Sequence, residues 1–189
     1  MDRYWLLTST TYGTWLPGDE RGFVSRVLDD SGQRTRHNVP GAPFDADLPR
    51  LRHKARNQMK GPAVFLTREQ AQVLLRQFRE TALHRGWLLL AAAIMANHFH
   101  VVLGVAGDPR PDALLRDLKS YGSRALNRRW SRPESGTWWT TSASRRRLPD
   151  EPAVLAAVEY VRRQPKALVV WIEQRSREET GSGDVFSGG

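Results

Sequence analysis

The sequence predicts an α+β fold in which helices cover an antiparallel sheet. Segments rich in aromatic and β-branched residues alternate along the chain with segments of helical periodicity. Their order is β, α, β, β, α, β, α, β, and no internal repeat is visible. That order is typical of a ferredoxin-like or RRM-like core. The chain of 189 residues is long enough for one domain with its own hydrophobic core.

The first part of the chain is expected to hold one strand, a long insertion and one helix. Residues 3–15 are rich in aromatic and β-branched side chains and predict the strand. Residues 17–62 combine many Gly, Pro, Asp and Arg residues without periodicity, which indicates a basic insertion: either an arm that meets a polyanion or a solvated linker. The helix is predicted to start at Thr67, with Gln70 completing a capping box, and to end at Gly86.

In the second part of the chain, strands and helices are expected to alternate at short intervals. Apolar runs and prolines mark their limits. The predicted elements are a buried strand at 87–93, a strand that begins near His98, a helix at 112–130, a short strand at 138–141, a helix from Pro152 to Pro165 and a short strand at 168–172. We expect residues 1–175 to form a single domain and the charged, Gly/Ser-rich residues 176–189 to form a flexible tail.

Composition points toward nucleic acid. The net charge is +9, and only four of the 29 basic residues are lysine. Arginine suits bidentate contacts with phosphate, and seven Trp and four Tyr could stack on unpaired bases. A GC-rich genome also produces an arginine-heavy chain. The absence of cysteine excludes disulfides and thiolate metal sites. Since no leader-like or membrane-length apolar run is present, we expect a cytoplasmic, nucleoid-associated protein.

The pair His98 and His100 is the strongest indication of chemistry. Strand alternation places both imidazoles on one face, while Phe99, Val101 and Leu103 point to the other. Two neutral imidazoles on a rigid sheet could provide half of a divalent-metal site. The spacing is short and common, so a solvated polar pair is the alternative interpretation.

Tyr121 is a candidate nucleophile on the helix that follows. It shares one side of that helix with Arg124 and Arg128, which could hold a phosphate beside the phenol. Tyr121 also falls on a helical stripe with Leu118 and Ala125, so it could equally extend the core.

Several of these motifs together resemble the single-tyrosine HUH transposases. They are the His98-Phe99-His100 strand, the Leu118-Lys119-Ser120-Tyr121 helix, the Trp138-Trp139 segment and the run Glu159-Tyr160-Val161-Arg162-Arg163-Gln164-Pro165. Within these transposases the chain is most similar to the REP-associated tyrosine transposases of the IS200-like superfamily. The resemblance spans roughly residues 3–170 in order, with the basic insertion as a variable part.

The resemblance implies an α+β HUH endonuclease fold and a DNA strand-transferase. His98 and His100 would hold Mg2+ or Mn2+, and Tyr121 would attack the scissile phosphate to give a 5′-phosphotyrosine link. The implied partner is single-stranded or hairpin DNA, which members of the family often bind as homodimers. Basic residues on and after the tyrosine helix are expected to contact this DNA, namely Lys119, Arg124, Arg128 and Arg129.

The third metal ligand departs from the family pattern, in which a glutamine follows the tyrosine by four residues. That position after Tyr121 is Ala125, which has no donor atom. Asp117 lies one turn before Tyr121 and could substitute, Asn127 is less favourably placed, and water is a further option. Tyr160 shares an apolar stripe with its neighbours and is expected to belong to the core.

Two other functions remain open at this stage. A noncatalytic module could bind single strands on an RRM-like sheet, with the histidines as surface groups. A metal-dependent nuclease could also use water in place of Tyr121 as its nucleophile.

Overall fold

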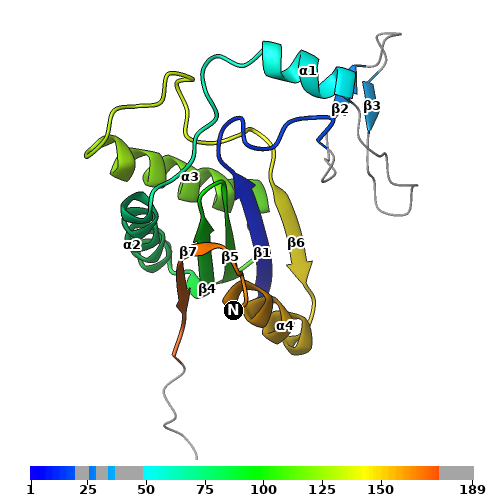
Figure 1. Ribbon diagram of the computed structural model, residues 1–189. Coiled ribbons are helices and arrows are strands. Elements are labelled where there is room, and N and C mark those ends of the chain that lie inside the picture. Colours follow the sequence, from blue (N-terminus) through cyan, green and yellow to red (C-terminus); the bar gives the residue numbers. More distant parts are fainter. Residues whose placement is uncertain (20–25, 29–33, 37–48, 175–189) are drawn as a thin grey trace, which may run out of the picture.

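The computed structural model describes residues 1–19, 26–28, 34–36 and 49–174, and it contains a five-stranded antiparallel sheet (Figure 1). The strand order is β6-β1-β5-β4-β7. The sheet strands are β1 (Arg3–Thr10), β4 (Leu88–Met95), β5 (His98–Val105), β6 (Ser144–Leu148) and β7 (Ala167–Ile172); the helices that pack on it are α2 (Arg68–Arg85), α3 (Pro111–Asn127) and α4 (Glu151–Arg162). The predicted α+β class and its antiparallel sheet are confirmed.

Helices cover both faces of this sheet. One face packs against α2 and α3, and the other packs against α4 (Figure 1). The central strand β5 pairs with β1 on one side and with β4 on the other. Alternate residues of β5 therefore enter two different cores, and the two faces of one strand carry different chemistry.

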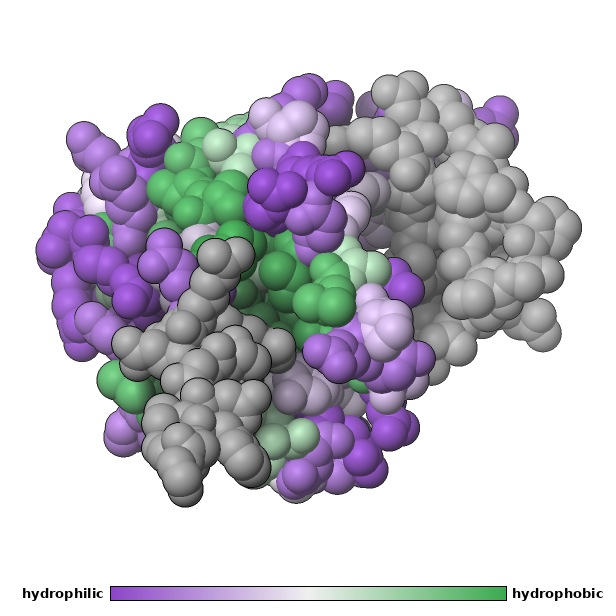
Figure 2. Space-filling model, turned by 90° about the horizontal axis from the view of Figure 1, so that it is seen from below, coloured by the Kyte–Doolittle hydropathy of each residue, from purple (hydrophilic) through white to green (hydrophobic). Residues whose placement is uncertain are grey.

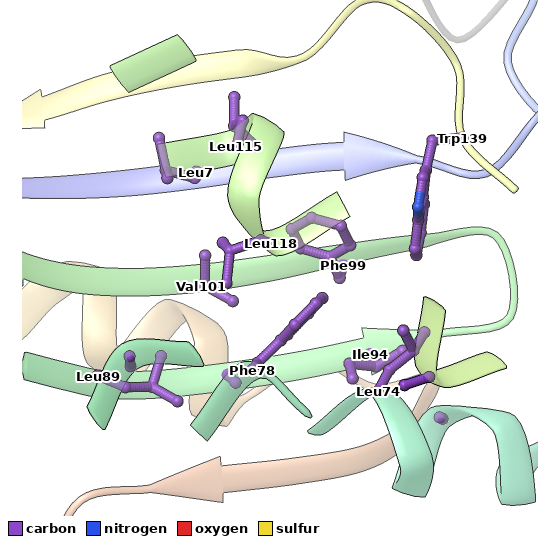
Figure 3. Close-up of a cluster of buried hydrophobic side chains, with 14 of the residues drawn as sticks. Leu7, Leu74, Phe78, Leu89, Ile94, Phe99, Val101, Leu115, Leu118 and Trp139 are labelled. Atoms are coloured by element: carbon purple, nitrogen blue, oxygen red, sulfur yellow. The ribbon is translucent and has the colours of Figure 1, made fainter. Parts of the chain in front are cut away.

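The larger core lies between the sheet and the helices α2 and α3 (Figure 3). Phe99 is fully buried and meets Phe78 edge-on, with ring centroids 5.0 Å apart, and Trp139 at 5.5 Å. Leu118 of α3 and Val101 of β5 are also fully buried in this cluster. Burial of each such side chain contributes about 1.5–3 kcal/mol to folding, so this face holds the sheet and helices together.

Local sequence signals fix the limits of α2 as predicted. The Thr67 hydroxyl accepts a hydrogen bond from the backbone N–H of Gln70, and the Gln70 side chain accepts one from the backbone N–H of Thr67. The helix ends at Gly86, whose φ of 65° favours glycine. The capping box therefore orients the helix that covers Phe99.

The predicted strand at 138–141 is wrong. Trp139 makes a single isolated bridge with Thr11, and the edge strand β6 begins only at Ser144. Both indoles are buried and bind α3 instead: the Nε1–H of Trp138 donates to Asn127, and that of Trp139 donates to the Lys119 carbonyl and to the Ser123 hydroxyl. Those bonds tie the segment to α3, and its backbone contact with the chain at Thr10–Tyr12 is too short to form a strand.

The basic insertion contains regular structure that its composition did not indicate. Its described parts form the short hairpin strands β2 (Arg26–Leu28) and β3 (Arg34–Arg36) and the helix α1 (Pro49–Asn57) (Figure 1). The rest of the insertion and the tail predicted at 176–189 lie outside the described residues. The first strand is also shorter than expected, ending at Thr10.

The surface agrees with a hydrophilic, charged composition. Figure 2 shows hydrophilic side chains around a smaller apolar area on the face seen from below. Within the described part of the chain, none of the helices combines the length and apolar character that crossing a membrane requires.

Candidate functional site on the histidine face

His98 and His100 lie side by side on the sheet face that α4 partly covers; we call this the histidine face. Val102, the next residue of β5 on this face, packs in the core with Val161 of α4, whereas Phe99 packs on the opposite side. The two imidazole centroids are 4.9 Å apart. The predicted placement of both rings on one face is confirmed.

His100 is held as a neutral ring. Its side chain is 6% exposed, and burial, assisted by the nearby charge of His98, lowers its pKa from 6.5 to about 4. Its Nδ1 lies 2.7 Å from the hydroxyl of Thr8, which is its partner across the β1–β5 pair. A neutral imidazole keeps a lone pair at neutral pH, which metal coordination requires.

Tyr160 lies beside His100, and its predicted place in the core is wrong. The phenol oxygen is 3.4 Å from His100 Nε2, and the two ring centroids are 5.2 Å apart. Tyr160 is 49% exposed, while Ala157 and Val161 of the same helix are buried. The apolar stripe of α4 therefore ends at these neighbours, and Tyr160 lies at the margin where the helix meets the histidine face.

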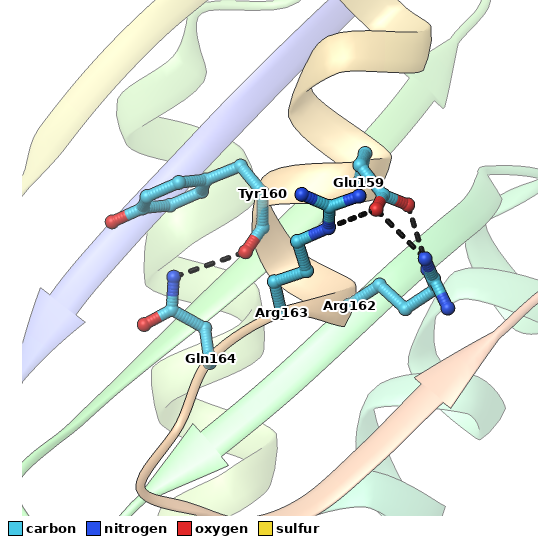
Figure 4. Close-up of polar contacts among 5 residues, drawn as sticks. All are labelled: Glu159, Tyr160, Arg162, Arg163 and Gln164. Atoms are coloured by element: carbon cyan, nitrogen blue, oxygen red, sulfur yellow. Dashed lines mark hydrogen bonds and ion pairs between the residues drawn. The ribbon is translucent and has the colours of Figure 1, made fainter.

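Gln164 follows Tyr160 by four residues, just beyond the end of α4. Its side-chain NH2 donates to the Tyr160 carbonyl at 3.0 Å. In Figure 4 Tyr160 and Gln164 lie on one side of the helix end, and the ion pairs of Glu159 with Arg162 and Arg163 lie on the other. These arginines lower the pKa of Glu159 to about 2, so the carboxylate is charged at neutral pH.

The structure does not bring Tyr121 together with the histidines. Tyr121 belongs to α3, which packs on the Phe99 face of the sheet. Its ring lies under the guanidinium groups of Arg85, at 5.9 Å, and Arg124, at 5.1 Å. The expected proximity of phenol and arginine is therefore present, but the sheet lies between this phenol and His100.

The other predicted residues of α3 lie on the same side as Tyr121. Asp117, the candidate third ligand, makes an ion pair with Arg85 at 3.0 Å. The Lys119 ammonium is half-buried and donates to the Thr140 carbonyl at 2.9 Å; burial lowers its pKa to about 8. Arg128 and Arg129 are exposed at the end of the helix. Asp117 is thus placed for an ion pair within the helical layer and is remote from the imidazoles.

The donor set of a metal site must therefore come from the histidine face. No group of three His, Cys, Asp or Glu residues that could hold a metal is found in the described ranges. His98 and His100 offer imidazole nitrogens on this face, and Gln164, at the same end of α4 as Tyr160, offers an amide oxygen. A mixed nitrogen and oxygen set of this kind would suit Mn2+ and be compatible with Mg2+.

A signal for this arrangement was present in the sequence. The spacing of tyrosine and glutamine that the family resemblance implies occurs at Tyr160 and Gln164, while Tyr121 has Ala125 in the glutamine position. Strand and helix periodicity alone could not reveal it, because they do not say which helix covers which face.

The fold and this site together define an α+β protein in which two histidines of the sheet lie beside a tyrosine of the covering helix α4. The profile of the family described as "Transposase IS200 like" matches residues 55–164, more than half of the chain. The chain belongs to this family, and the resemblance predicted from the sequence is confirmed.

The solved structures similar to the chain include two that are described as transposases. One is a REP-associated tyrosine transposase bound to a REP hairpin, with 12% identity, a TM-score of 0.46, and coverage of 85% of this chain and 64% of that one. This chain therefore spans less than two thirds of that protein. The other is a candidate transposase from Deinococcus radiodurans R1, with 16% identity, a TM-score of 0.41, and coverage of 87% and 92%. A comparison with curated proteins gives no match.

Proposed function

We propose that this IS200-like transposase cleaves and rejoins single-stranded DNA, with Tyr160 as the nucleophile in place of Tyr121. The observation that carries the proposal is the 3.4 Å separation between the Tyr160 hydroxyl and His100 Nε2. A phenol oxygen becomes an effective nucleophile when a neighbouring group polarises its target. Tyr160 has such neighbours on the histidine face, and Tyr121 contacts only groups of the helical layer among the described contacts.

His98, His100 and Gln164 would hold Mg2+ or Mn2+ on this face. The depressed pKa of His100 supports this assignment, because the ring does not have to lose a proton before it binds a cation at neutral pH. The side-chain NH2 of Gln164 is engaged by the Tyr160 carbonyl, which leaves the amide oxygen as its donor atom. When bound, the cation would polarise the scissile phosphate.

In the proposed reaction the Tyr160 oxygen attacks the phosphorus in line with the leaving 3′-oxygen. The new bond joins tyrosine to the 5′-phosphate, the phenol proton goes to solvent, and the released 3′-oxygen takes up a proton. Attack by another 3′-hydroxyl on the phosphotyrosine reverses these changes and rejoins DNA. The partial exposure of Tyr160 leaves room for a strand to reach the phenol.

DNA binding is proposed for the basic residues at the end of α3. Arg124, Arg128 and Arg129 are exposed, and the chain has a net charge of +9. Exposed guanidinium groups neutralise backbone phosphates and make binding sensitive to salt. We keep Lys119 as a weaker candidate, because its ammonium is bound to the Thr140 carbonyl. Single-stranded or hairpin DNA is the proposed partner, a homodimer is the proposed assembly, and the nucleoid is the proposed location.

The test is covalent capture of DNA in the presence of Mn2+. Hairpin oligonucleotides with a single-stranded flank are labelled at the 3′-end or at the 5′-end and incubated with the parent chain, Tyr160→Phe and Tyr121→Phe. We expect a 3′-labelled protein–DNA adduct with the parent and with Tyr121→Phe, and none with Tyr160→Phe. The 5′-labelled product should be a shorter strand with a free 3′-hydroxyl.

Three results would contradict the proposal. An adduct that persists in Tyr160→Phe and disappears in Tyr121→Phe would return the nucleophile to α3. Cleavage without any adduct in either variant would indicate hydrolysis by water. Salt-sensitive binding without cleavage by the parent would indicate a noncatalytic binding module.

A further inference from the structure

The same nitrogen of each imidazole has a hydrogen-bond partner from a neighbouring residue. His98 Nδ1 lies 2.6 Å from the Asn97 side-chain oxygen, and His100 Nδ1 lies 2.7 Å from the Thr8 hydroxyl. These partners come from different parts of the chain: Asn97 precedes β5, and Thr8 is the residue of β1 that pairs with His100. Both rings are therefore fixed through Nδ1.

Hydrogen-bond chemistry then decides where each proton lies. A neutral imidazole has one N–H donor and one lone-pair nitrogen. The amide oxygen of Asn97 only accepts, so Nδ1 of His98 carries the proton. A threonine hydroxyl accepts and donates, so Thr8 can receive the Nδ1 proton of His100 as well. With Thr8 as the acceptor, Nε2 is the lone-pair nitrogen of both rings.

The Nε2 side of His100 is also the side that faces the proposed nucleophile. Tyr160 approaches Nε2 to 3.4 Å, across the ring from Thr8. A His100 ring turned about its Cβ–Cγ bond would place Nδ1 or a carbon on that side instead. The Thr8 hydroxyl disfavours this turn, because the buried Nδ1 would lose its hydrogen bond.

We infer that Thr8 and Asn97 are positioning residues, which hold the imidazole protons on Nδ1 and direct the Nε2 lone pairs of His98 and His100 toward the cation site beside Tyr160. The inference rests on the proposed function and deepens its site. Partners of this kind orient metal-binding histidines, and their removal typically costs about 10–100-fold in metal affinity.

The variants are chosen to separate positioning from folding. Thr8→Val keeps the β-branched shape and the backbone pairing of β1 but lacks the hydroxyl, and Thr8→Ser restores it. Asn97→Ala removes the other acceptor. Ser9→Ala is the matched control, because Ser9 is the next residue of the same strand, is buried on the opposite side, and finds no hydrogen-bond partner for its hydroxyl among the described residues.

Two readouts are measured on the full chain. The ¹⁵N shifts of histidine-labelled, metal-free protein at pH 7.5 report which ring nitrogen carries the proton. We expect Nδ1–H on both rings in the parent, in Thr8→Ser and in Ser9→Ala, and a mixture of tautomers at His100 in Thr8→Val. Titration of Mn2+ followed by its EPR signal should show about 10–100-fold weaker binding by Thr8→Val and Asn97→Ala than by the parent. Thr8→Ser should regain most of this affinity.

The outcome is decided without any activity assay. Nε2–H tautomers in the parent, or Mn2+ affinity and tautomers unchanged in Thr8→Val, would overturn the inference. If the parent shows the expected tautomers and Mn2+ affinities but forms no DNA adduct, the proposed reaction fails while the positioning roles stand. Loss of the native fold in Thr8→Val is checked by circular dichroism, and the decision then falls to Asn97→Ala.

Discussion

Replacement of Thr11 by valine should destabilise the chain through one buried hydroxyl. Thr11 is fully buried just after β1, and its Oγ1 lies 2.6 Å from the Val64 carbonyl oxygen and 3.1 Å from the Asn97 carbonyl oxygen. It therefore joins three segments: the end of β1, the approach to α2, and the turn that leads into His98. Valine has nearly the same shape, so the change removes the hydrogen bonds with little effect on packing.

The expected loss of stability depends on which hydrogen bonds each carbonyl keeps in the Thr11→Val variant. The Asn97 carbonyl still accepts the Thr11 backbone N–H at 2.9 Å and the Thr14 hydroxyl at 3.1 Å. The short bond to the Val64 carbonyl is lost. A net hydrogen bond is worth about 1 kcal/mol, and a buried carbonyl left without its donor costs about 1–3 kcal/mol. We expect a loss of about 2–3 kcal/mol, or a fall in Tm of about 4–12 °C for a chain of this size.

Urea denaturation followed by circular dichroism measures this loss. The midpoint should fall for Thr11→Val while the slope with denaturant stays the same, since the area exposed on unfolding does not change. The control is Thr141→Val at an exposed threonine, which should change stability by less than about 0.5 kcal/mol. A Thr11→Val chain as stable as this control would refute the assigned role of the hydroxyl.

Three further predictions concern other groups of the chain. Ser9→Ala should raise the free energy of unfolding by about 1 kcal/mol in urea denaturation, because the buried Ser9 hydroxyl has no partner in the part of the chain that the structure describes; a loss of similar size would contradict this. Burial lowers the pKa of Lys119 to about 8. Between about pH 8 and pH 10.5 the unfolded chain therefore binds more protons than the folded chain, and the free energy of unfolding of the parent rises with pH. In urea denaturation Lys119→Met should have a higher free energy of unfolding than the parent at pH 7, and this difference should shrink as the pH rises toward about 10.5. A difference that is constant with pH would argue against the buried charge. Glu159→Gln removes the carboxylate that pairs with Arg162 and Arg163, so affinity for a fluorescent single strand at low salt should rise about 2–5-fold, with the gain lost in high salt; unchanged affinity would place these arginines away from the DNA.

Sequence patterns were sufficient for most of the fold because its elements obey local rules. The helix from Thr67 to Gly86 carries its own start and stop signals, and the structure shows both. The alternation around Phe99 correctly separated a polar face from a core face. The conformation of the segment at Trp138 could not be predicted from local patterns. It depends on hydrogen bonds from two indoles to α3, which join parts of the chain that are distant in sequence.

The site was only half predictable for a related reason. The histidine pair is local: two residues apart on one strand, they share a face in any sheet. A partner for them must come from a helix, and composition does not tell whether α3 or α4 covers that face. Tyr121 has suitable arginine neighbours, yet it lies across the sheet, whereas Tyr160 reaches His100 because the connection through the edge strand β6 carries α4 to the opposite side.

That topology also explains why a tyrosine expected in the core is so exposed. α4 is anchored to the sheet by Val154, Ala157 and Val161, all buried, and a residue one position before Val161 is turned by about 100° from it. At this angle the side chain of Tyr160 points away from the core and lies at the edge of the helix–sheet contact, beside His100. The anchoring residues therefore set the distance between the phenol of Tyr160 and the imidazole of His100. Larger side chains at Ala157 that tilt α4 should reduce adduct formation in the DNA capture assay while the affinity for DNA stays the same. An adduct yield that follows DNA affinity across such variants would show that the helix does not set this distance.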